Sequence, residues 1–198
     1  MVPNSKNPKK RAAEYSVSFD AVIVGAGFAG MYMLHCLRGM GLSAKVYETG
    51  GGVGGTWYWN QYPGARCDVE SMQYSYSFSE ELDQEWSWSE KYSPQPEILA
   101  YANHVADRFD LRKDIFFDTQ VTAATFDEYK KCWRIETNRG DQVNAQFCIM
   151  AVGCLSAANT PPFDGISDFQ GPIYHTGEWP HDGVNLKGLQ VGVIGTGS

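Results

Sequence analysis

Ala21-Val22-Ile23-Val24-Gly25-Ala26-Gly27-Phe28-Ala29-Gly30 is the stretch of sequence that decides the fold. It begins with a short apolar run, typical of a buried strand, and continues into a glycine turn of the form Gly-x-Gly-x-x-Gly. Residues 28–40 then carry apolar side chains at helical spacing, and a second strand is predicted over residues 45–48. A strand, a glycine turn, a helix and another strand in this order indicate a dinucleotide-binding βαβ unit.

Each glycine of this turn has a physical task in such a unit. Gly25 permits the tight bend, Gly27 lets backbone N–H groups meet a pyrophosphate, and Gly30 lets the helix pack closely on the sheet. Glu48, 18 residues after Gly30, is placed to accept a hydrogen bond from a ribose hydroxyl. Its charge would repel a 2′-phosphate, so the first nucleotide is expected to be FAD or NAD rather than NADP. The candidate cofactor-binding residues of this unit are Gly25, Gly27, Phe28, Gly30 and Glu48.

A second glycine cluster, at residues 50–55, follows Glu48 directly. An NAD dehydrogenase rarely needs two such clusters within one βαβ unit, whereas a bulky cofactor lying against the backbone needs both, and we therefore favour FAD. Gly55 belongs to this cluster, Thr56 offers a hydroxyl to phosphate or ribitol, and Trp57 offers a ring face for stacking. The alternative for Trp57 is simple packing in the core.

The remaining elements complete an α/β fold. A helix is expected to end near residue 109, and strand-like stretches follow at residues 115–117, 121–126, 133–137 and 142–149, forming a small β-meander inserted around 115–149. The run Phe147–Val152 is apolar throughout, which predicts a strand buried on both faces. The sequence thus predicts a Rossmann-like FAD-binding domain with a parallel sheet plus this meander.

Bulk composition excludes several classes of function. A formal net charge of −7 and a pI near 5.0 argue against a nucleic-acid partner. No run of about 18 apolar residues exists, so no membrane partner or span is expected. The five cysteines form no Cys-x-x-Cys pair, which indicates reduced thiols in a cytoplasmic protein and no metal site. Residues 1–16, rich in Lys, Pro and Asn, are expected to be a disordered leader.

Two longer stretches identify a family resemblance. The loop Gly54-Gly55-Thr56-Trp57-Tyr58-Trp59-Asn60-Gln61-Tyr62-Pro63-Gly64-Ala65-Arg66-Cys67-Asp68 resembles the flavin-side loop of Baeyer–Villiger monooxygenases. The stretch Phe169-Gln170-Gly171-Pro172-Ile173-Tyr174-His175-Thr176-Gly177-Glu178-Trp179-Pro180 matches that family's fingerprint, FxGxxxHxxxW followed by Pro or Asp. The loop and the fingerprint are most similar to the phenylacetone and steroid monooxygenase branch.

The resemblance implies a flavin monooxygenase that uses FAD, NADPH and O2. Such enzymes insert oxygen next to the carbonyl of a small ketone substrate, through a C4a-peroxyflavin, and release an ester or lactone. By motif, Asp68 is the aspartate that pairs with an essential arginine beside the flavin, while a turn-capping role is the alternative. The resemblance further implies cofactor contacts at Arg66, Cys67, Asp68, Tyr74 and Val121.

The fingerprint is expected to lie in a linker between two nucleotide-binding domains. The resemblance implies that its histidine serves as a hydrogen-bonding hinge. A metal-ligand role is not expected, because no second histidine stands at ligand spacing. The fingerprint residues that we single out are Phe169, Gly171, His175, Trp179 and Pro180.

A second glycine turn opens at the end of the sequence, after the apolar run Val191–Ile194, which is expected to be a strand. Its residues Gly195, Thr196, Gly197 and Ser198 would begin an NADPH site. The predicted organisation is an FAD-binding domain at 17–153, a linker at 154–188 and the start of a truncated second Rossmann-like NADPH domain at 189–198. The chain is therefore expected to be an N-terminal fragment, inactive alone. The alternatives are a monooxygenase that oxygenates nitrogen or sulfur, and a stand-alone FAD-binding module.

Overall fold

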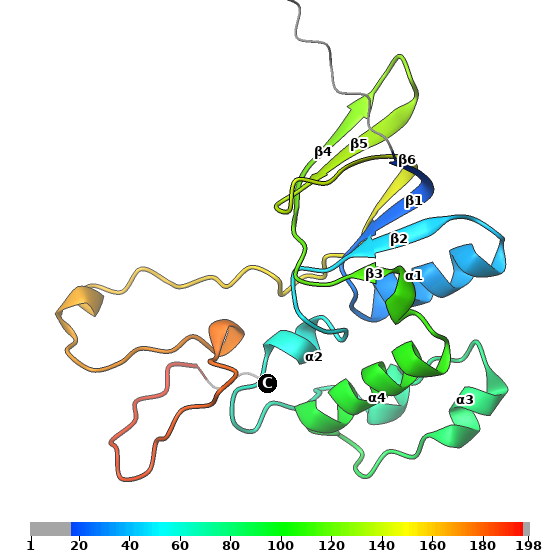
Figure 1. The fold of residues 1–198 in the computed structure, drawn as a ribbon. Coiled ribbons are helices and arrows are strands. Elements are labelled where there is room, and N and C mark those ends of the chain that lie inside the picture. Colours follow the sequence, from blue (N-terminus) through cyan, green and yellow to red (C-terminus); the bar gives the residue numbers. More distant parts are fainter. Residues whose placement is uncertain (1–16, 196–198) are drawn as a thin grey trace, which may run out of the picture.

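The computed structural model describes residues 17–195 and shows a six-stranded mixed sheet. The strand order is β3-β2-β1-β6-β5-β4 (Figure 1). β1, β2, β3 and β6 pair in parallel, and β6, β5 and β4 pair antiparallel. The strands are β1 Val17–Val24, β2 Ala44–Tyr47, β3 Ile115–Phe116, β4 Val121–Asp127, β5 Cys132–Thr137 and β6 Gln142–Met150. The expected leader and the turn residues Thr196, Gly197 and Ser198 lie outside the described residues.

The predicted α/β fold with its parallel sheet and meander is confirmed, with one change of membership. β3 was expected to begin the meander, yet it pairs in parallel with β2 and extends the parallel part of the sheet. β6 belongs to both parts, because one of its edges pairs with β1 and the other with β5. The meander is therefore joined to the dinucleotide-binding unit by a shared strand.

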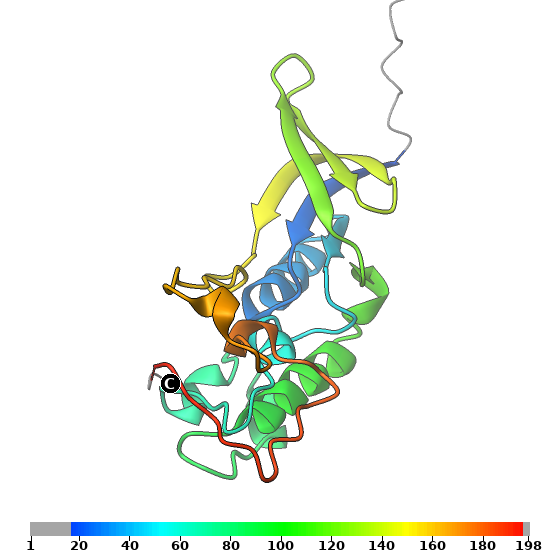
Figure 2. The ribbon, with the colours of Figure 1, turned by 90° about the vertical axis from the view of Figure 1, so that its left-hand side faces the viewer.

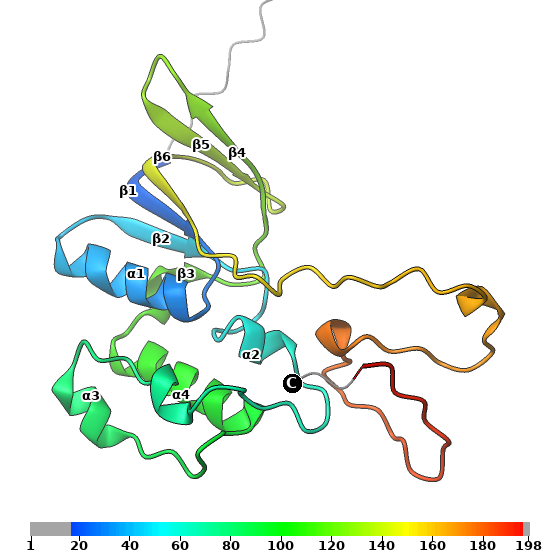
Figure 3. The same ribbon diagram turned by 180° about the vertical axis from the view of Figure 1, so that it is seen from behind.

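Helices cover one side of the parallel strands and continue below them (Figures 1 and 3). Helix α1 packs its apolar face, including Met31 and Leu34, against β1 and β2. Helix α4 adds Ala102 and Ala106 to the same buried cluster, so these two helices and the sheet share one core. The helices are α1 Phe28–Gly39, α2 Thr56–Trp59, α3 Glu80–Glu85 and α4 Gln95–Arg108, and the 3-10 turns are η1 Ser71–Tyr74, η2 Arg112–Asp114, η3 Ile166–Asp168 and η4 Thr176–Glu178.

The expectation that the apolar end of β6 is buried on both faces is wrong. The side chain of Phe147 is 50% exposed and that of Met150 is 61% exposed. These two side chains lie on opposite faces of β6, because their positions differ by an odd number. Ile149 still packs against the cluster that includes α1, but the main contacts of α1 are with β1 and β2, so within the described residues the end of β6 is only partly covered.

The chain leaves the sheet after β6 and runs as an extended segment that departs from the body and returns beside α2 (Figures 1 and 2). Its only regular structure within the described residues is η3 and η4. The expected strand Val191–Ile194 is not formed, and Val193 and Ile194 are each 81% exposed. A strand needs a neighbour for its backbone groups, and no described strand lies beside this run. No helix in residues 17–195 has the length and apolarity to cross a membrane.

Candidate nucleotide-binding site

The first glycine turn lies at the carboxyl ends of β1 and β6, where the fold itself requires two of its glycines. Gly25 has φ +101° and donates its N–H to the carbonyl of Tyr47 at 2.8 Å. A Cβ on Gly25 would lie 2.5 Å from the carbonyl oxygen of Ala151. A Cβ on Gly30 would lie 1.9 Å from the carbonyl oxygen of Gly25, so only glycine lets α1 pack so close to the turn.

Gly27 has no such structural reason to be glycine. Its backbone is extended, with φ −73° and ψ −172°, and a Cβ there would meet the Cα of Gly55 at an ordinary 3.5 Å. The backbone N–H groups of residues 27–30 have no acceptor among the described residues, and no side chain caps this end of α1. These free donors and the positive end of the helix dipole make a site for an anion, such as the pyrophosphate of a dinucleotide. The glycine at position 27 leaves that site open.

Glu48 holds the two glycine clusters together. The side chain is only 6% exposed, and its Oε2 accepts the N–H of Ala26 at 2.6 Å while its Oε1 accepts the N–H of Gly50 at 2.7 Å. The N–H of Gly54 also donates to the carbonyl of Ala26 at 3.1 Å. Each carboxylate oxygen has a further lone pair, so Glu48 can accept a ribose hydroxyl while it holds both turns. The sequence suggested the ribose contact but not the holding of the turns.

The second glycine cluster faces the first turn directly. Gly55 has φ +55°, and a Cβ on it would lie 2.9 Å from the Cα of Gly27. Gly55 also precedes Thr56, the first residue of α2. The two clusters therefore line one backbone surface, as expected of a cofactor that lies against both.

The segment before β4 lies beside Glu48, although residue spacing alone gave no sign of it. The N–H of Thr119 donates to the carbonyl of Glu48 at 2.8 Å, and that of Asp118 donates to the carbonyl of Gly50 at 3.0 Å. Val121, predicted to contact the adenine, follows two residues later and packs at the edge of a buried cluster. This arrangement supports the predicted position of Val121 near the nucleoside end of the site.

Aromatic rings line the other side of the first turn. The ring of Tyr74 meets the rings of Phe28 and Trp57 edge-on, with centroids 5.4 and 5.5 Å apart. Trp57 is 7% exposed and packs with Cys67 and Ile98, so the alternative of core packing describes its surroundings well. Burial raises the pKa of Tyr74 above its ordinary value.

Asp68 stands on a loop that is fixed at both ends. The N–H of Cys67 donates to the carbonyl of Ser93 at 3.1 Å, and the N–H of Ser71 donates to the carbonyl of Lys91 at 2.8 Å. Asp68 itself is exposed, and its carboxylate has no hydrogen-bond or ion-pair partner among residues 17–195. A turn-capping role therefore finds no support, while a carboxylate on a fixed loop is available to an external cation.

Arg66, by contrast, is engaged away from the glycine turns. Its guanidinium donates to the carboxylate of Glu90 at 3.1 Å and to the carbonyl of Tyr92 at 3.0 Å. The thiol of Cys67 is buried and lies 3.4 Å from the carbonyl oxygen of Ser93. In this structure both side chains fix the loop that carries Asp68, and a direct cofactor contact by either of them stays a prediction.

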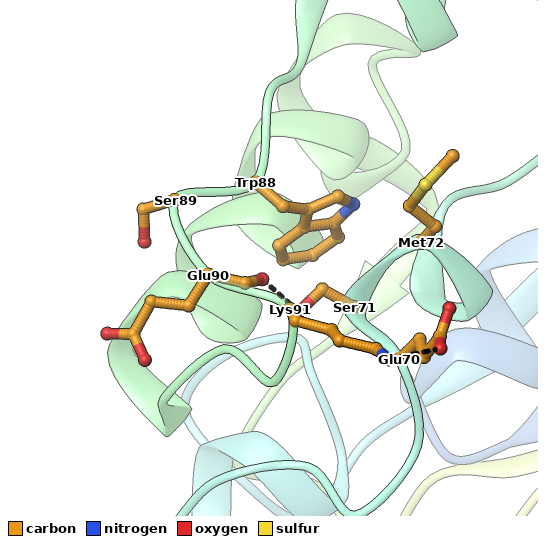
Figure 4. A pocket seen from close by; sticks show the side chains of 7 residues that line it. All are labelled: Glu70, Ser71, Met72, Trp88, Ser89, Glu90 and Lys91. Atoms are coloured by element: carbon orange, nitrogen blue, oxygen red, sulfur yellow. Dashed lines mark hydrogen bonds and ion pairs between the residues drawn. The ribbon is translucent and has the colours of Figure 1, made fainter.

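A pocket of about 270 Å³ opens next to the end of this loop, between residues 70–72 and 88–91 (Figure 4). The ammonium of Lys91 pairs with Glu70 at 3.0 Å, and the hydroxyl of Ser71 donates to the carbonyl of Glu90 at 2.7 Å (Figure 4). None of the site residues predicted from sequence lines it. Its contacts stabilise the base of the Asp68 loop.

The fingerprint forms a self-contained structure within the extended segment. The ring of Phe169 lies against Gly171, where a Cβ would be 2.7 Å from the ring. His175 Nδ1 accepts the backbone N–H two residues ahead at 3.0 Å, which caps η4. The ring of Trp179 lies 5.6 Å from that of Tyr174. The described contacts bring none of these residues to the glycine turns, and Gly195 is exposed with no strand before it.

One residue that contacts the second glycine cluster's neighbours, His181, was missed at the level of sequence. His181 follows the fingerprint, and its ring lies 5.3 Å from that of Tyr58 and 5.9 Å from that of Trp59. Only an aromatic pair next to a glycine cluster signals this contact in the sequence. Within residues 17–195, no group of three or more His, Cys, Asp or Glu residues is placed to hold a metal ion.

Comparison with known proteins agrees with this geometry. The chain is 50% identical over 181 residues to a Baeyer-Villiger monooxygenase of Pseudooceanicola batsensis, covering 91% of the chain and 33% of that protein. It is 49% identical over 181 residues to the phenazine N-monooxygenase PhzNO1 of Lysobacter antibioticus, again covering 91% of the chain and 33% of the relative. The chain thus spans about a third of the length of the curated relatives that it matches.

A solved structure gives the same result for the fold. An oxidized steroid monooxygenase bound to NADP superposes with a TM-score of 0.85 and 63% sequence identity, over 92% of this chain and 35% of that one. The predicted resemblance to Baeyer–Villiger monooxygenases is confirmed by these similarities. The sequence profile of one family, described as pyridine nucleotide-disulphide oxidoreductase, matches residues 22–198. Since that match includes the glycine turn, Glu48, the Asp68 loop and the fingerprint, the chain belongs to the pyridine nucleotide-disulphide oxidoreductase family.

Proposed function

We propose that this chain supplies the FAD-binding turn of a Baeyer–Villiger monooxygenase, an enzyme that uses NADPH and O2 to insert oxygen beside the carbonyl of a small ketone. The observation that carries the proposal is Gly27. The fold requires glycine at positions 25 and 30, whereas an open position 27 beside free N–H groups is what an incoming anionic ligand needs. The covered share of the relatives supports the view that the chain forms about a third of such an enzyme.

The residues fit FAD by their chemistry. The N–H groups of residues 27–30 would hold the pyrophosphate, Glu48 would accept ribose hydroxyls, and the backbone around Val121 would border the adenine. Thr56 and the aromatic rings of Phe28, Trp57 and Tyr74 lie on the side where the flavin half would extend. The chemistry that FAD supplies when bound is the transfer of electrons from NADPH to oxygen.

Asp68 has the properties that the proposed reaction needs from a positioning carboxylate. It is exposed, it lacks a partner in residues 17–195, and the hydrogen bonds on both sides of it fix its backbone. An arginine seated against it would be held in place and kept charged, and could stabilise negative charge that develops on oxygen during the reaction. We include in the proposal the hinge role of His175, whose capping of η4 stiffens the fingerprint.

The proposed cofactors are FAD and NADPH, and the proposed reactants are a small ketone and O2. The NADP bound to the similar steroid monooxygenase supports the second cofactor. The domain boundaries at 153 and 188 stay part of the proposal, and the change from regular to extended structure after β6 supports the first of them. A cytoplasmic location is supported by five cysteines that stay free thiols.

The test is a product analysis under ¹⁸O2 with the complete polypeptide that carries this sequence. With NADPH and a panel of linear and cyclic ketones, the proposal expects an ester or lactone that contains one ¹⁸O atom per NADPH consumed. NADPH oxidation that releases only hydrogen peroxide with every ketone would contradict it.

A second function has specific support, because the phenazine N-monooxygenase is as similar to this chain as the Baeyer-Villiger enzyme is. Oxygen transfer to a nitrogen heterocycle would use the same nucleotide site. The same ¹⁸O2 experiment with phenazine and with a sulfide separates the two, since an N-oxide or S-oxide without any ester favours the second function. Trp179 and Pro180 in the fingerprint favour the ketone reaction.

A further inference from the structure

We propose that Tyr58 and His181 couple the position of the linker to the glycine loop that follows Glu48. Both would be positioning residues for dinucleotide binding. This inference rests on the proposed FAD site and extends it.

His181 is the described point of contact between the extended segment and the body. Its ring meets the ring of Tyr58 with centroids 5.3 Å apart at 69°, and the ring of Trp59 at 5.9 Å and 55°. The hydrogen bonds described for residues 154–195 all stay within that segment. Without His181, little in the described structure fixes where the linker lies.

Tyr58, in α2, contacts both His181 and the glycine loop at residues 50–52. Its ring is enclosed by backbone, since a Cβ on Gly50 would lie 2.7 Å from the ring and one on Gly52 would lie 3.0 Å from it. Its Oη accepts the N–H of Gly51 at 3.0 Å. Tyr58 therefore holds the loop from one side while His181 contacts its ring from the linker.

The loop that Tyr58 holds is the one that Glu48 also holds. The N–H of Gly50 donates to Glu48 Oε1, and the neighbouring N–H of Gly51 donates to Tyr58. A shift of the Tyr58 ring would therefore change the geometry of the loop at Gly50 and Gly51. Gly50 is hydrogen-bonded to Glu48, the proposed acceptor of the ribose hydroxyl. Because coupling between two equilibria is reciprocal, a dinucleotide that stabilises the loop must also favour the docked linker, and the docked linker must strengthen binding of the dinucleotide. Among variants of one site, such a change in affinity appears mainly in the dissociation rate.

The first test measures the loop without any cofactor. Amide exchange of Gly50, Gly51 and Gly54, detected by NMR, is expected to rise about three- to tenfold in His181→Ala, since two ring contacts are lost. His181→Phe keeps a ring at this position and is expected to restore slow exchange. Asn185→Ala is the matched control, because Asn185 is exposed and its described hydrogen bond, from the N–H of Lys187, stays inside the linker, so its loss should leave the loop unchanged.

Tyr58→Phe separates the two halves of the coupling. The ring remains, so nuclear Overhauser contacts between His181 and the ring at position 58 should persist. The hydroxyl acceptor is lost, so Gly51 exchange should rise and His181→Ala should add no further increase. Equal exchange in wild-type protein, His181→Ala and Tyr58→Phe would overturn the proposal.

The second test adds FAD. His181→Ala is expected to speed FAD dissociation by about the same three- to tenfold factor, and His181→Phe is expected to reverse this. If FAD does not bind at all, the proposed function fails while the exchange result still decides the coupling. If FAD binds and its dissociation rate is the same in wild-type protein and His181→Ala, the coupling to dinucleotide binding is refuted and the proposed function stands.

Discussion

Replacing Glu48 by glutamine tests whether this buried carboxylate holds the two glycine clusters together. In the wild-type chain its two oxygens accept the N–H groups of Ala26 and Gly50 at 2.6 and 2.7 Å, and the side chain is 6% exposed. Glutamine has one carbonyl oxygen and one NH2 group, so it can accept only one of these hydrogen bonds. The other backbone N–H would face a second donor in a buried position.

The loss of unfolding free energy in Glu48→Gln follows from these two hydrogen bonds. An unsatisfied buried donor costs about 1–3 kcal/mol, and the remaining hydrogen bond loses its charged acceptor, which about halves its strength. Removing a buried charge offsets part of this loss. We expect a net destabilisation of about 2 kcal/mol, which corresponds to a fall in Tm of about 4–8 °C for a chain of this size.

The assay is urea unfolding followed by tryptophan fluorescence. Glu128→Gln is the matched control, because Glu128 forms an exposed pair with Lys131 and should change the free energy of unfolding by less than about 0.5 kcal/mol. An equal, small loss in both variants would refute the view that Glu48 fixes the two turns.

Three further predictions concern other parts of the molecule. Gly30→Ala should destabilise the chain by more than about 3 kcal/mol, because the new Cβ would lie 1.9 Å from the carbonyl oxygen of Gly25. In contrast, Gly39→Ala, with no atom within 4 Å, should stabilise α1 by about 0.5–1 kcal/mol in the same urea assay, and equal effects would contradict the packing argument. Asp68→Asn should leave Tm within about 2 °C but lower ester formation by the complete polypeptide by about 100-fold or more; unchanged turnover would exclude the proposed role. Burial, and next the charge of Arg38, lowers the pKa of His35 below 6.5 in the folded chain. The unfolded chain therefore binds a proton more readily, so the contribution of His35 to the free energy of unfolding should be fully present above pH 6.5 and be lost as the pH falls below it. His35→Gln should flatten this decline in chemical unfolding curves measured between pH 5 and 8, and an unchanged slope would assign the decline to other groups.

Much of the fold followed from local patterns. The apolar run at residues 21–24, the glycine turn and the helical spacing after it were read correctly because each is a short-range signal. Residues 138–141, Asn-Arg-Gly-Asp, have the composition of a hairpin turn, and they lie between two antiparallel strands. The three failures, at β3, at Phe147 and at Val191–Ile194, share a cause: burial and strand pairing depend on which distant segments lie beside a run, and an apolar run does not specify them.

In the candidate site, too, local signals were predicted correctly and contacts between distant segments were missed. Spacing placed Glu48 beside the first turn but could not reveal that its carboxylate accepts N–H groups from both glycine clusters. Motif resemblance singled out Arg66, yet the structure engages it with Glu90, because ion pairs between distant segments are set by tertiary packing. The contact between His181 and Tyr58 joins residues 123 positions apart, and no periodic signal covers such a distance.

A binding titration of this chain tests the central claim most directly. The claim is that the turn at Gly25–Gly30 and Glu48 form the site for the ADP half of FAD. We predict that FAD and ADP-ribose bind to the wild-type chain in isothermal titration calorimetry, that FMN does not, and that Gly27→Val abolishes binding although the variant still unfolds in one cooperative transition, destabilised by about 1 kcal/mol at the N-cap of α1. A folded chain that binds neither FAD nor ADP-ribose, or a Gly27→Val variant that binds FAD as tightly as wild type, would contradict the claim.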